Sequence, residues 1–161
     1  MKILKFTAFF FFAATLLTNA QQVSDHALGL RLGDSDGFGA EISYQKSLSS
    51  DRRLEFDLGW RDSRHFDAFK IAGLYQWVQV LDGDFNWYYG AGAGLGSVDF
   101  ALLPDDGGLF VFAAGDIGIE YNFDFPLLLS LDFRPELGIL GYSNFSNSFD
   151  FDIALGVRYK F

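Results

Sequence analysis

The thirteen residues FDFDIALGVRYKF, positions 149–161, alternate strictly between two kinds of side chain. The even-numbered positions are charged or small. The odd-numbered positions are all apolar or aromatic: Phe149, Phe151, Ile153, Leu155, Val157, Tyr159 and Phe161. Because successive side chains of a β-strand point to opposite faces of its sheet, the stretch predicts a strand with one apolar face and one polar face.

The same two-residue period recurs through most of the chain. It predicts eight strands, separated by turn clusters rich in Gly, Asp, Ser and Pro. No segment has helical periodicity, and no linker divides the chain. The predicted strands cover residues 23–32, 38–48, 53–60, 66–81, 85–98, 109–123, 127–139 and 149–161.

Composition narrows the class of protein. The chain has 161 residues, which suits one domain, and 19% of them are aromatic, including 20 Phe. It contains no Cys, which excludes disulfides and thiolate metal sites. A formal net charge of −9 argues against nucleic-acid binding through a basic patch.

The amino terminus has the pattern of a secretory signal. Lys2 and Lys5 precede an apolar run over residues 6–17, and Thr18 and Ala20 supply small residues before a cleavage point. The run is shorter than the ~20 residues that a transmembrane helix needs. We therefore predict a cleaved signal peptide at residues 1–20 and one barrel domain at residues 21–161.

Alternation alone does not say which face of the strands lies inside. A soluble barrel has an apolar interior, whereas a membrane barrel turns its apolar face to lipid and has a polar lumen. Here the polar faces carry both signs of charge, as a paired interior network would. The charges expected in that network are Asp25, Arg31, Arg53, Glu55, Asp132, Arg134, Glu136, Asp152 and Arg158.

Two further features favour a polar lumen. Gly90, Gly92, Gly94 and Gly96 share one face, where they would make room in a narrow lumen for long Arg and Glu side chains. Aromatic residues gather at the strand ends, as at the two interfaces of a membrane. One predicted girdle contains Phe85, Trp87, Tyr121, Phe123, Tyr159 and Phe161, and the other contains Phe38, Trp60, Phe66, Phe69, Phe149 and Phe151.

The stretch 149–161 resembles the terminal strand of Gram-negative outer-membrane β-barrel proteins. In that family the last residue is typically Phe, and aromatic or aliphatic residues alternate before it. Leu155, Val157, Tyr159 and Phe161 match this pattern. With the signal peptide and the eight strands, the chain is similar to the small OmpA-type and OmpX-type barrels.

This resemblance implies an all-β fold, an eight-stranded antiparallel up-and-down transmembrane β-barrel in the outer membrane. The four matching residues would be an assembly signal for the barrel assembly machinery. The barrel would be a monomer surrounded by outer-membrane lipid and lipopolysaccharide. Both termini and the turns at 49–52, 82–84 and 124–126 would face the periplasm, and the segments 33–37, 61–65, 99–108 and 141–148 would be outer loops.

Candidate chemistry in the sequence is sparse. Some barrels of this kind are lipid A acyl-modifying enzymes with Ser and His near the outer rim, and Ser63 and His65 offer those two residue types. No enzyme motif surrounds them, and we expect no catalytic residue, cofactor or metal ion. The acidic residues of the outer loops are interpreted as turn formers and solvated charge. The leading hypothesis is a structural or surface-interaction role without enzymatic activity. The alternatives are a lipid A acyl-modifying enzyme and a soluble secreted barrel that binds a small hydrophobic ligand.

Overall fold

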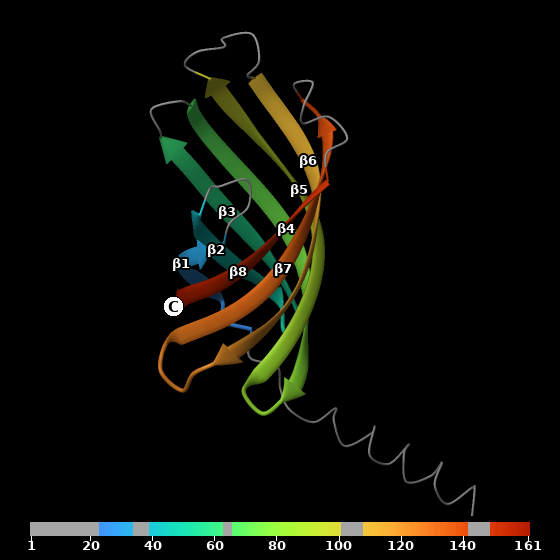
Figure 1. The fold of residues 1–161 in the computed structure, drawn as a ribbon. Helices are drawn as coiled ribbons and strands as arrows, with labels where there is room; N and C mark the ends of the chain where they lie inside the picture. Colours follow the sequence, from blue (N-terminus) through green and yellow to red (C-terminus); the bar gives the residue numbers. More distant parts are fainter. Residues whose placement is uncertain (1–22, 34–38, 63–65, 101–107, 142–148) are drawn as a thin grey trace, which may run out of the picture.

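The computed structural model describes residues 23–33, 39–62, 66–100, 108–141 and 149–161. These residues form a closed antiparallel barrel in which each strand pairs with its neighbours in the sequence and β1 pairs with β8 (Figure 1). The described strands are β1 (His26–Leu32), β2 (Ala40–Ser49), β3 (Arg52–Asp62), β4 (Phe66–Asp82), β5 (Phe85–Phe100), β6 (Gly108–Asn122), β7 (Leu127–Leu140) and β8 (Phe149–Lys160). The prediction of an eight-stranded up-and-down barrel is confirmed.

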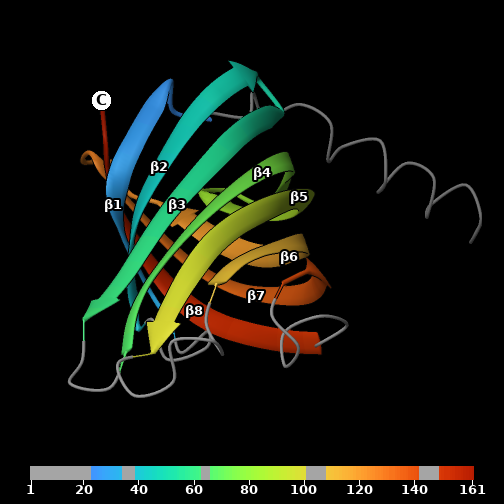
Figure 2. The same cartoon turned by 90° about the horizontal axis from the view of Figure 1, so that it is seen from above.

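The strands run obliquely to the barrel axis, so that β1–β3 cross the direction of β6–β8 on the opposite wall (Figure 2). The register gives the size of this slant. From Arg31, the pairs through β2, β3, β4 and β5 lead to Phe110 on β6, whereas the pairs through β8 and β7 lead to Glu120. The register is therefore displaced by ten residues around the barrel. Strand tilt and this displacement are linked in any closed barrel.

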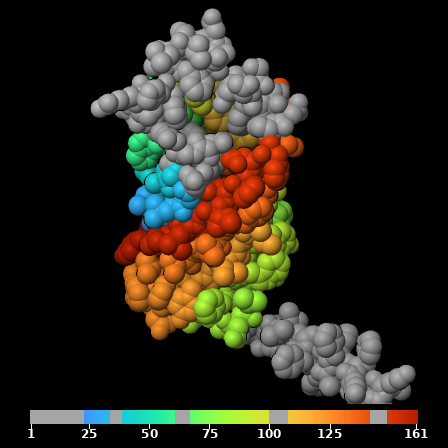
Figure 3. Space-filling view, in the orientation of Figure 1, coloured from blue at the N-terminus to red at the C-terminus, as the bar shows by residue number. Residues whose placement is uncertain are grey.

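The two ends of the barrel differ. One end, which we call the turn end, holds the start of β1, the end of β8 and the short turns that follow β2, β4 and β6. Gly83 adopts a φ of 54° in the turn after β4, a conformation that favours glycine. The opposite end, the loop end, holds the connections that follow β1, β3, β5 and β7. β8 lies between β1 and β7 across one face of the molecule (Figure 3).

Strand boundaries differ from the prediction mainly at β1 and toward the loop end. β1 begins at His26 instead of residue 23, and Asp25 is exposed before it, with its carbonyl accepting a hydrogen bond from the Ser47 N–H at 3.0 Å. The expectation that Asp25 belongs to the interior network is therefore wrong. β4 ends one residue later than predicted, at Asp82 at the turn end, and β5 ends two residues later, at Phe100, which pairs with Phe66 at the loop end.

Alternation places the charged face inside and the apolar face outside. Arg134 is 0% exposed, whereas Leu155 on the neighbouring strand is 42% exposed. Residues that interrupt the alternation turn inward: Leu74, Val78, Phe110 and Phe112 are all buried in the lumen. No helix in the described part of the chain is both long and apolar enough to cross a membrane.

The glycine stripe of β5 serves a different purpose from the one predicted. A Cβ atom on Gly94 would overlap the ring of Phe112, and one on Gly96 would overlap the ring of Phe110. A Cβ atom on Gly90 would meet the side chain of Gln76. Gly90, Gly94 and Gly96 thus make room for the Gln76 side chain and two aromatic rings, and the expectation that the stripe accommodates Arg and Glu side chains is wrong.

Candidate functional site: the charged lumen and the apolar outer surface

The lumen is centred on Arg134 of β7, which contacts three carboxylates of β2 and β3. Its guanidinium lies 3.3 Å from Glu41, 3.2 Å from Glu55 and 2.5 Å from Asp57. All four side chains are almost fully buried. Buried charges must be paired, and this cluster pairs one wall of the barrel with the opposite one.

Arg31 is the second bridging cation, and it joins β1 to three other strands. It lies 3.0 Å from Glu41 on β2, 2.5 Å from Asp132 on β7 and 2.6 Å from Asp152 on β8. β1 is the shortest strand that the structure describes, with 7 residues. The closure between β1 and β8 is therefore held by ion pairs in the lumen as well as by the backbone ladder.

Arg158 and Arg53 extend the network toward the turn end. Arg158 contacts Glu55 at 3.2 Å and donates to the hydroxyls of Ser43 and Ser130 at 2.9 and 2.8 Å. Arg53 lies 2.6 Å from Glu120 and 4.6 Å from the centre of the Tyr88 ring. The lumen is thus filled with side chains along this half, as an eight-stranded barrel allows.

Toward the loop end the lumen changes character. Lys70 on β4 reaches Glu136 on β7 at 2.8 Å, and its ammonium lies 5.2 Å from the centre of the Phe112 ring. On both sides of Lys70, the β4–β6 wall presents a buried apolar cluster of Ala68, Ala72, Leu74, Val98, Phe110, Phe112 and Ala114.

The described lumen holds more acids than bases. Eight carboxylates are buried, namely Glu41, Glu55, Asp57, Asp116, Glu120, Asp132, Glu136 and Asp152. Five cations are buried with them, namely Arg31, Arg53, Lys70, Arg134 and Arg158. Apart from Asp25, the structure confirms every charge that the sequence assigned to the interior. It adds Lys70 and four further carboxylates, which also alternate with apolar residues in the sequence.

The outer surface of the barrel is apolar around its circumference. On β8, Leu155 has Leu32 of β1 and Leu131 of β7 as register partners, and Val157 has Leu30 and Leu129. Leu32, Leu131 and Leu30 are each exposed, with exposed fractions between 43% and 48%. A soluble protein rarely exposes a continuous apolar surface of this extent, whereas a transmembrane barrel requires one.

Aromatic rings gather at both ends of this apolar surface. At the turn end of β4 and β5, Trp77 packs on Tyr75 at 4.8 Å and on Tyr89 at 5.4 Å between ring centres. The rings continue across β6, where Tyr121 lies 4.6 Å from Phe85 and 4.7 Å from Phe123.

At the loop end, Trp60 and Phe69 are register partners, and both are exposed. Phe149 and Phe151 are exposed on β8. Of the residues predicted for this girdle, Phe38 and the side chain of Phe66 lie outside the described part of the structure. Two aromatic belts of this kind mark the interfaces of a membrane barrel.

Sequence comparisons find no matching family model and no matching curated protein. Solved structures do match. The N-terminal β-barrel domain of Pseudomonas aeruginosa OprF has a TM-score of 0.67 at 13% identity, covering 87% of this chain and 100% of that one. Neisserial surface protein A has a TM-score of 0.61 at 16% identity, covering 84% and 94%. Ail, the attachment invasion locus protein of Yersinia pestis, has a TM-score of 0.57 at 17% identity, covering 86% and 97%.

The chain has the fold of the small outer-membrane β-barrels. Its eight strands, charged lumen and two aromatic belts all belong to this architecture. At these identities the likeness concerns the fold.

Within this outer-membrane-type barrel, the four residues predicted as an assembly signal share the outer face of β8. Leu155, Val157 and Tyr159 are exposed there, and Phe161 follows the strand. Phe161 exchanges two backbone hydrogen bonds with His26 of β1, at 3.2 and 3.0 Å. Its ring stacks on the His26 ring with 5.5 Å between centres. The predicted signal therefore lies along the seam that closes the barrel.

Of the two histidines in the sequence, the structure describes His26 and not His65. His26 lies at the turn end, where its Nδ1 is 2.7 Å from the Tyr44 hydroxyl. Ser63 and His65 lie outside the described residues, so the structure does not place this pair. Among the residues that it does describe, no group of three acidic or histidine side chains is arranged to hold a metal ion.

Proposed function

We propose that this chain is an integral protein of a Gram-negative outer membrane, with a structural or surface-interaction role and no enzymatic activity. The observation that carries the proposal is the inverted distribution of side chains. Arginines and carboxylates fill the interior, while leucines, isoleucines and aromatic rings cover the exterior. Exposing such an exterior to water is unfavourable, whereas contact with the hydrocarbon layer of a membrane is favourable.

The alternative of a soluble barrel with a hydrophobic ligand does not fit this distribution. Such a protein needs an apolar cavity inside and a polar surface outside. Here the interior contains Arg31, Arg53, Arg134 and Arg158, each with at least one carboxylate within 3.2 Å. A role that depends on the surface exposed at the loop end requires no ligand in the lumen.

Maturation and assembly follow from the same proposal. Residues 1–20 would be removed on export, leaving residues 21–161 as the barrel domain. The barrel assembly machinery would recognise Leu155, Val157, Tyr159 and Phe161. The mature barrel would be a monomer in contact with outer-membrane lipid and lipopolysaccharide, with the turn end toward the periplasm.

Membrane fractionation and gel mobility test the location and the fold together. We expect the protein in the outer-membrane fraction, and we expect its mobility in detergent gels to change after boiling because a closed barrel resists detergent at room temperature. Recovery in the soluble fraction with a single mobility would contradict the proposal.

Mass spectrometry of lipid A tests the absence of enzymatic activity. Lipid A from cells with and without the protein should give the same acyl pattern. An acyl change that depends on Ser63 or His65, and that disappears in Ser63→Ala or His65→Ala, would replace our proposal with the enzyme alternative.

A further inference from the structure

Asp116 on β6 is a buried carboxylate without a cation. The described lumen holds three more buried acids than buried bases. In that part of the chain, seven of the eight buried carboxylates form an ion pair with Arg or Lys, and Asp116 forms none. Asp116 is only 5% exposed. Because a buried charge is unfavourable unless it is paired, Asp116 requires a positive partner.

One hydrogen bond orients the Asp116 carboxylate but does not neutralise it. The Asp116 Oδ2 accepts a hydrogen bond from the side-chain amide nitrogen of Gln76 on β4. The amide oxygen of Gln76 in turn accepts a hydrogen bond from Arg53 at 2.6 Å, which fixes the orientation of the amide. An amide carries no charge to offset that of the carboxylate. The Asp116 Oδ1 is buried and has no hydrogen-bond partner among the described residues.

The hydroxyl of Tyr88 on β5 is a second buried oxygen in the same section of the lumen. Tyr88 is 0% exposed, and its hydroxyl has no hydrogen-bond partner among the described residues. A Cβ atom on Gly118 would be 2.6 Å from the hydroxyl oxygen, so this oxygen lies against the lumen side of Gly118. Asp116 precedes Gly118 by two residues on β6, which places both residues on the lumen face of the strand.

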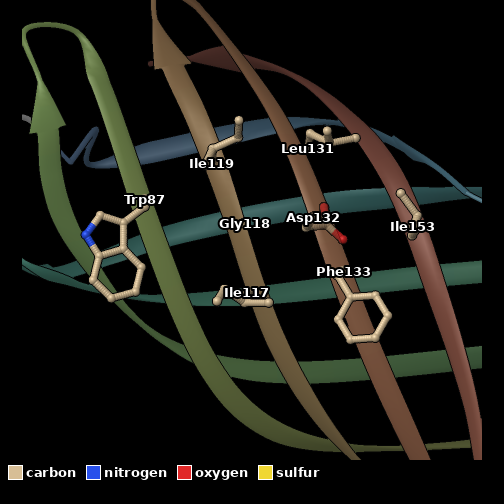
Figure 4. Close-up of a pocket in the computed structure, with 8 residues that line it drawn as sticks. All are labelled: Trp87, Ile117, Gly118, Ile119, Leu131, Asp132, Phe133 and Ile153. Atoms are coloured by element: carbon tan, nitrogen blue, oxygen red, sulfur yellow. The ribbon is translucent and has the colours of Figure 1, made fainter.

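Asp132 on β7 supplies a third oxygen. It is the register partner of Gly118, beside which it lies (Figure 4). The Asp132 Oδ1 accepts two hydrogen bonds from Arg31, whereas its Oδ2 is buried and has no hydrogen-bond partner among the described residues. The carboxylates that act most strongly on the Tyr88 hydroxyl are those of Asp132 and Asp116. We call Tyr88, Asp116 and Asp132 the lumen site.

Three arginines approach the lumen site, and each of them is bound to acids outside it. These arginines are Arg53, Arg134 and Arg158, and each has a carboxylate within 3.2 Å. In the described structure none of them forms an ion pair with Asp116, and none donates a hydrogen bond to the Tyr88 hydroxyl. The lumen site therefore offers three buried oxygen atoms that no described donor occupies.

Three such oxygen atoms suit a hard cation, which prefers oxygen ligands. Oxygen ligands lie about 2.3–2.6 Å from an ion such as Ca²⁺, so two ligands of one ion stand farther apart than the two atoms of a hydrogen bond. The Tyr88 hydroxyl, which makes no hydrogen bond to either carboxylate, meets this condition. A single positive charge matches the site, because Asp132 already shares its charge with Arg31 and only Asp116 is uncompensated.

We propose that Tyr88, Asp116 and Asp132 bind one monovalent alkali cation in the lumen, with water molecules as its remaining ligands. The ion supplies the positive charge that Asp116 lacks, and it joins β5, β6 and β7 on their lumen side. Two carboxylates and a phenol make this site different from a divalent metal centre, for which the described residues offer no group of three acidic or histidine side chains.

Urea unfolding at constant ionic strength tests the lumen site. The barrel is folded in detergent micelles, and Na⁺ replaces N-methylglucamine stepwise, because that organic cation is too large to fit among the side chains of the lumen. The urea midpoint of the unsubstituted barrel should rise with the Na⁺ concentration, since an ion that binds only the folded state stabilises it. Asp116→Asn and Tyr88→Phe should each remove most of this dependence. Asp57→Asn is the matched control: it removes another buried carboxylate, from the pair with Arg134, and should keep the dependence.

Three outcomes would overturn the lumen site. An equal Na⁺ dependence in all four proteins would mean that Na⁺ acts on the barrel as a whole. A midpoint of the unsubstituted barrel that does not change with Na⁺ would mean that no ion binds. If that midpoint falls as the pH rises, without any effect of Na⁺, and the midpoint of Asp116→Asn does not, then Asp116 carries a proton in place of the ion.

Crystallography with thallium supplies a second readout. Tl⁺ substitutes for alkali cations, and its anomalous scattering locates it directly. Crystals of the unsubstituted barrel grown with Tl⁺ should show one anomalous peak in the lumen, between the oxygen atoms of Tyr88, Asp116 and Asp132. Crystals of Tyr88→Phe or Asp116→Asn should lose this peak. The same peak in both variants, or lumen peaks only at other positions, would contradict the site.

Discussion

Replacing Arg134 with Met should destabilise the barrel strongly, and neutralising one particular carboxylate should restore part of the loss. Arg134 contacts three acids, but they depend on it to different degrees. Glu41 keeps Arg31 at 3.0 Å, and Glu55 keeps Arg158 at 3.2 Å and the Gln45 amide at 2.5 Å. In the described part of the chain, the one ion pair of Asp57 is with Arg134.

The magnitude follows from this difference. Removing one partner of a buried ion pair costs about 3–5 kcal/mol, because the other charge stays buried without compensation. Arg134→Met leaves Asp57 in that situation, and adding Asp57→Asn removes the stranded charge. The double variant should therefore be more stable than Arg134→Met alone, with a coupling energy of about 1–3 kcal/mol.

Glu41→Gln is the matched control for this rescue. Neutralising Glu41 in the Arg134→Met background also takes one carboxylate away from Arg31, so it should restore little or no stability. Urea unfolding in phospholipid vesicles, followed by tryptophan fluorescence, gives the free energies of unfolding of the unsubstituted barrel, of the three single variants and of the two double variants. If Glu41→Gln rescues the barrel as well as Asp57→Asn does, the pairing described for Arg134 is wrong.

Three other predictions test the two faces of the wall and the seam. Leu155→Arg should cost about 2–4 kcal/mol of unfolding free energy in vesicles, and Tyr159→Arg about 0–1 kcal/mol, because the penalty for a lipid-facing cation falls toward the interface. Phe112→Ala should cost about 3–5 kcal/mol of unfolding free energy, because it leaves a cavity between Lys70 and Gly94. Any conductance that this variant shows in planar bilayers should prefer cations, because carboxylates outnumber cations in the lumen. Phe161→Ala should lower the amount of folded barrel in the outer membrane, measured by gel mobility of membrane fractions.

The sequence alone could predict the fold because a two-residue period carries information on both faces of a strand. On each of the eight strands, the apolar residues on one face and the charges on the other indicate the same orientation of the strand. Leu74, Val78, Phe110 and Phe112 looked like interruptions of that pattern. The structure places all four in the lumen, where an apolar residue is tolerated if its neighbours are apolar or aromatic. These four side chains point inward because of their positions in the two-residue alternation of the strand, and not because of their polarity.

The pairing inside the lumen could not be predicted from the sequence. Lys70 and Glu136 are 66 residues apart, and they meet because the register displacement brings β4 and β7 to the same height across the lumen. The alternation of a single strand contains no information on that displacement. The purpose of the glycine stripe could not be predicted for the same reason, since its neighbours Phe110 and Phe112 belong to the next strand.

Phe161 takes part in the pairing of β1 with β8 that closes the barrel, so a single substitution there does not test the assembly signal by itself. Phe161 has two possible roles, because its ring is both the last aromatic of the predicted signal and the partner of the His26 ring. Phe161→Ala removes both. His26→Ala removes the stacking and the contact with Tyr44, but it keeps the aromatic residue at position 161.

The two variants should therefore be compared in two settings. Phe161→Ala loses ring contacts with His26 and Tyr159, and His26→Ala loses ring contacts with Phe161 and Tyr44. Each ring contact contributes about 0.5–1.5 kcal/mol, so purified barrels of both variants should unfold at similar, lower urea concentrations in vesicles. In cells, His26→Ala should reach the outer membrane at nearly the normal level, and Phe161→Ala should not. An equal shortfall of both variants in cells would mean that Phe161 acts by closing the seam with β1, and that recognition by the assembly machinery depends on other residues of β8.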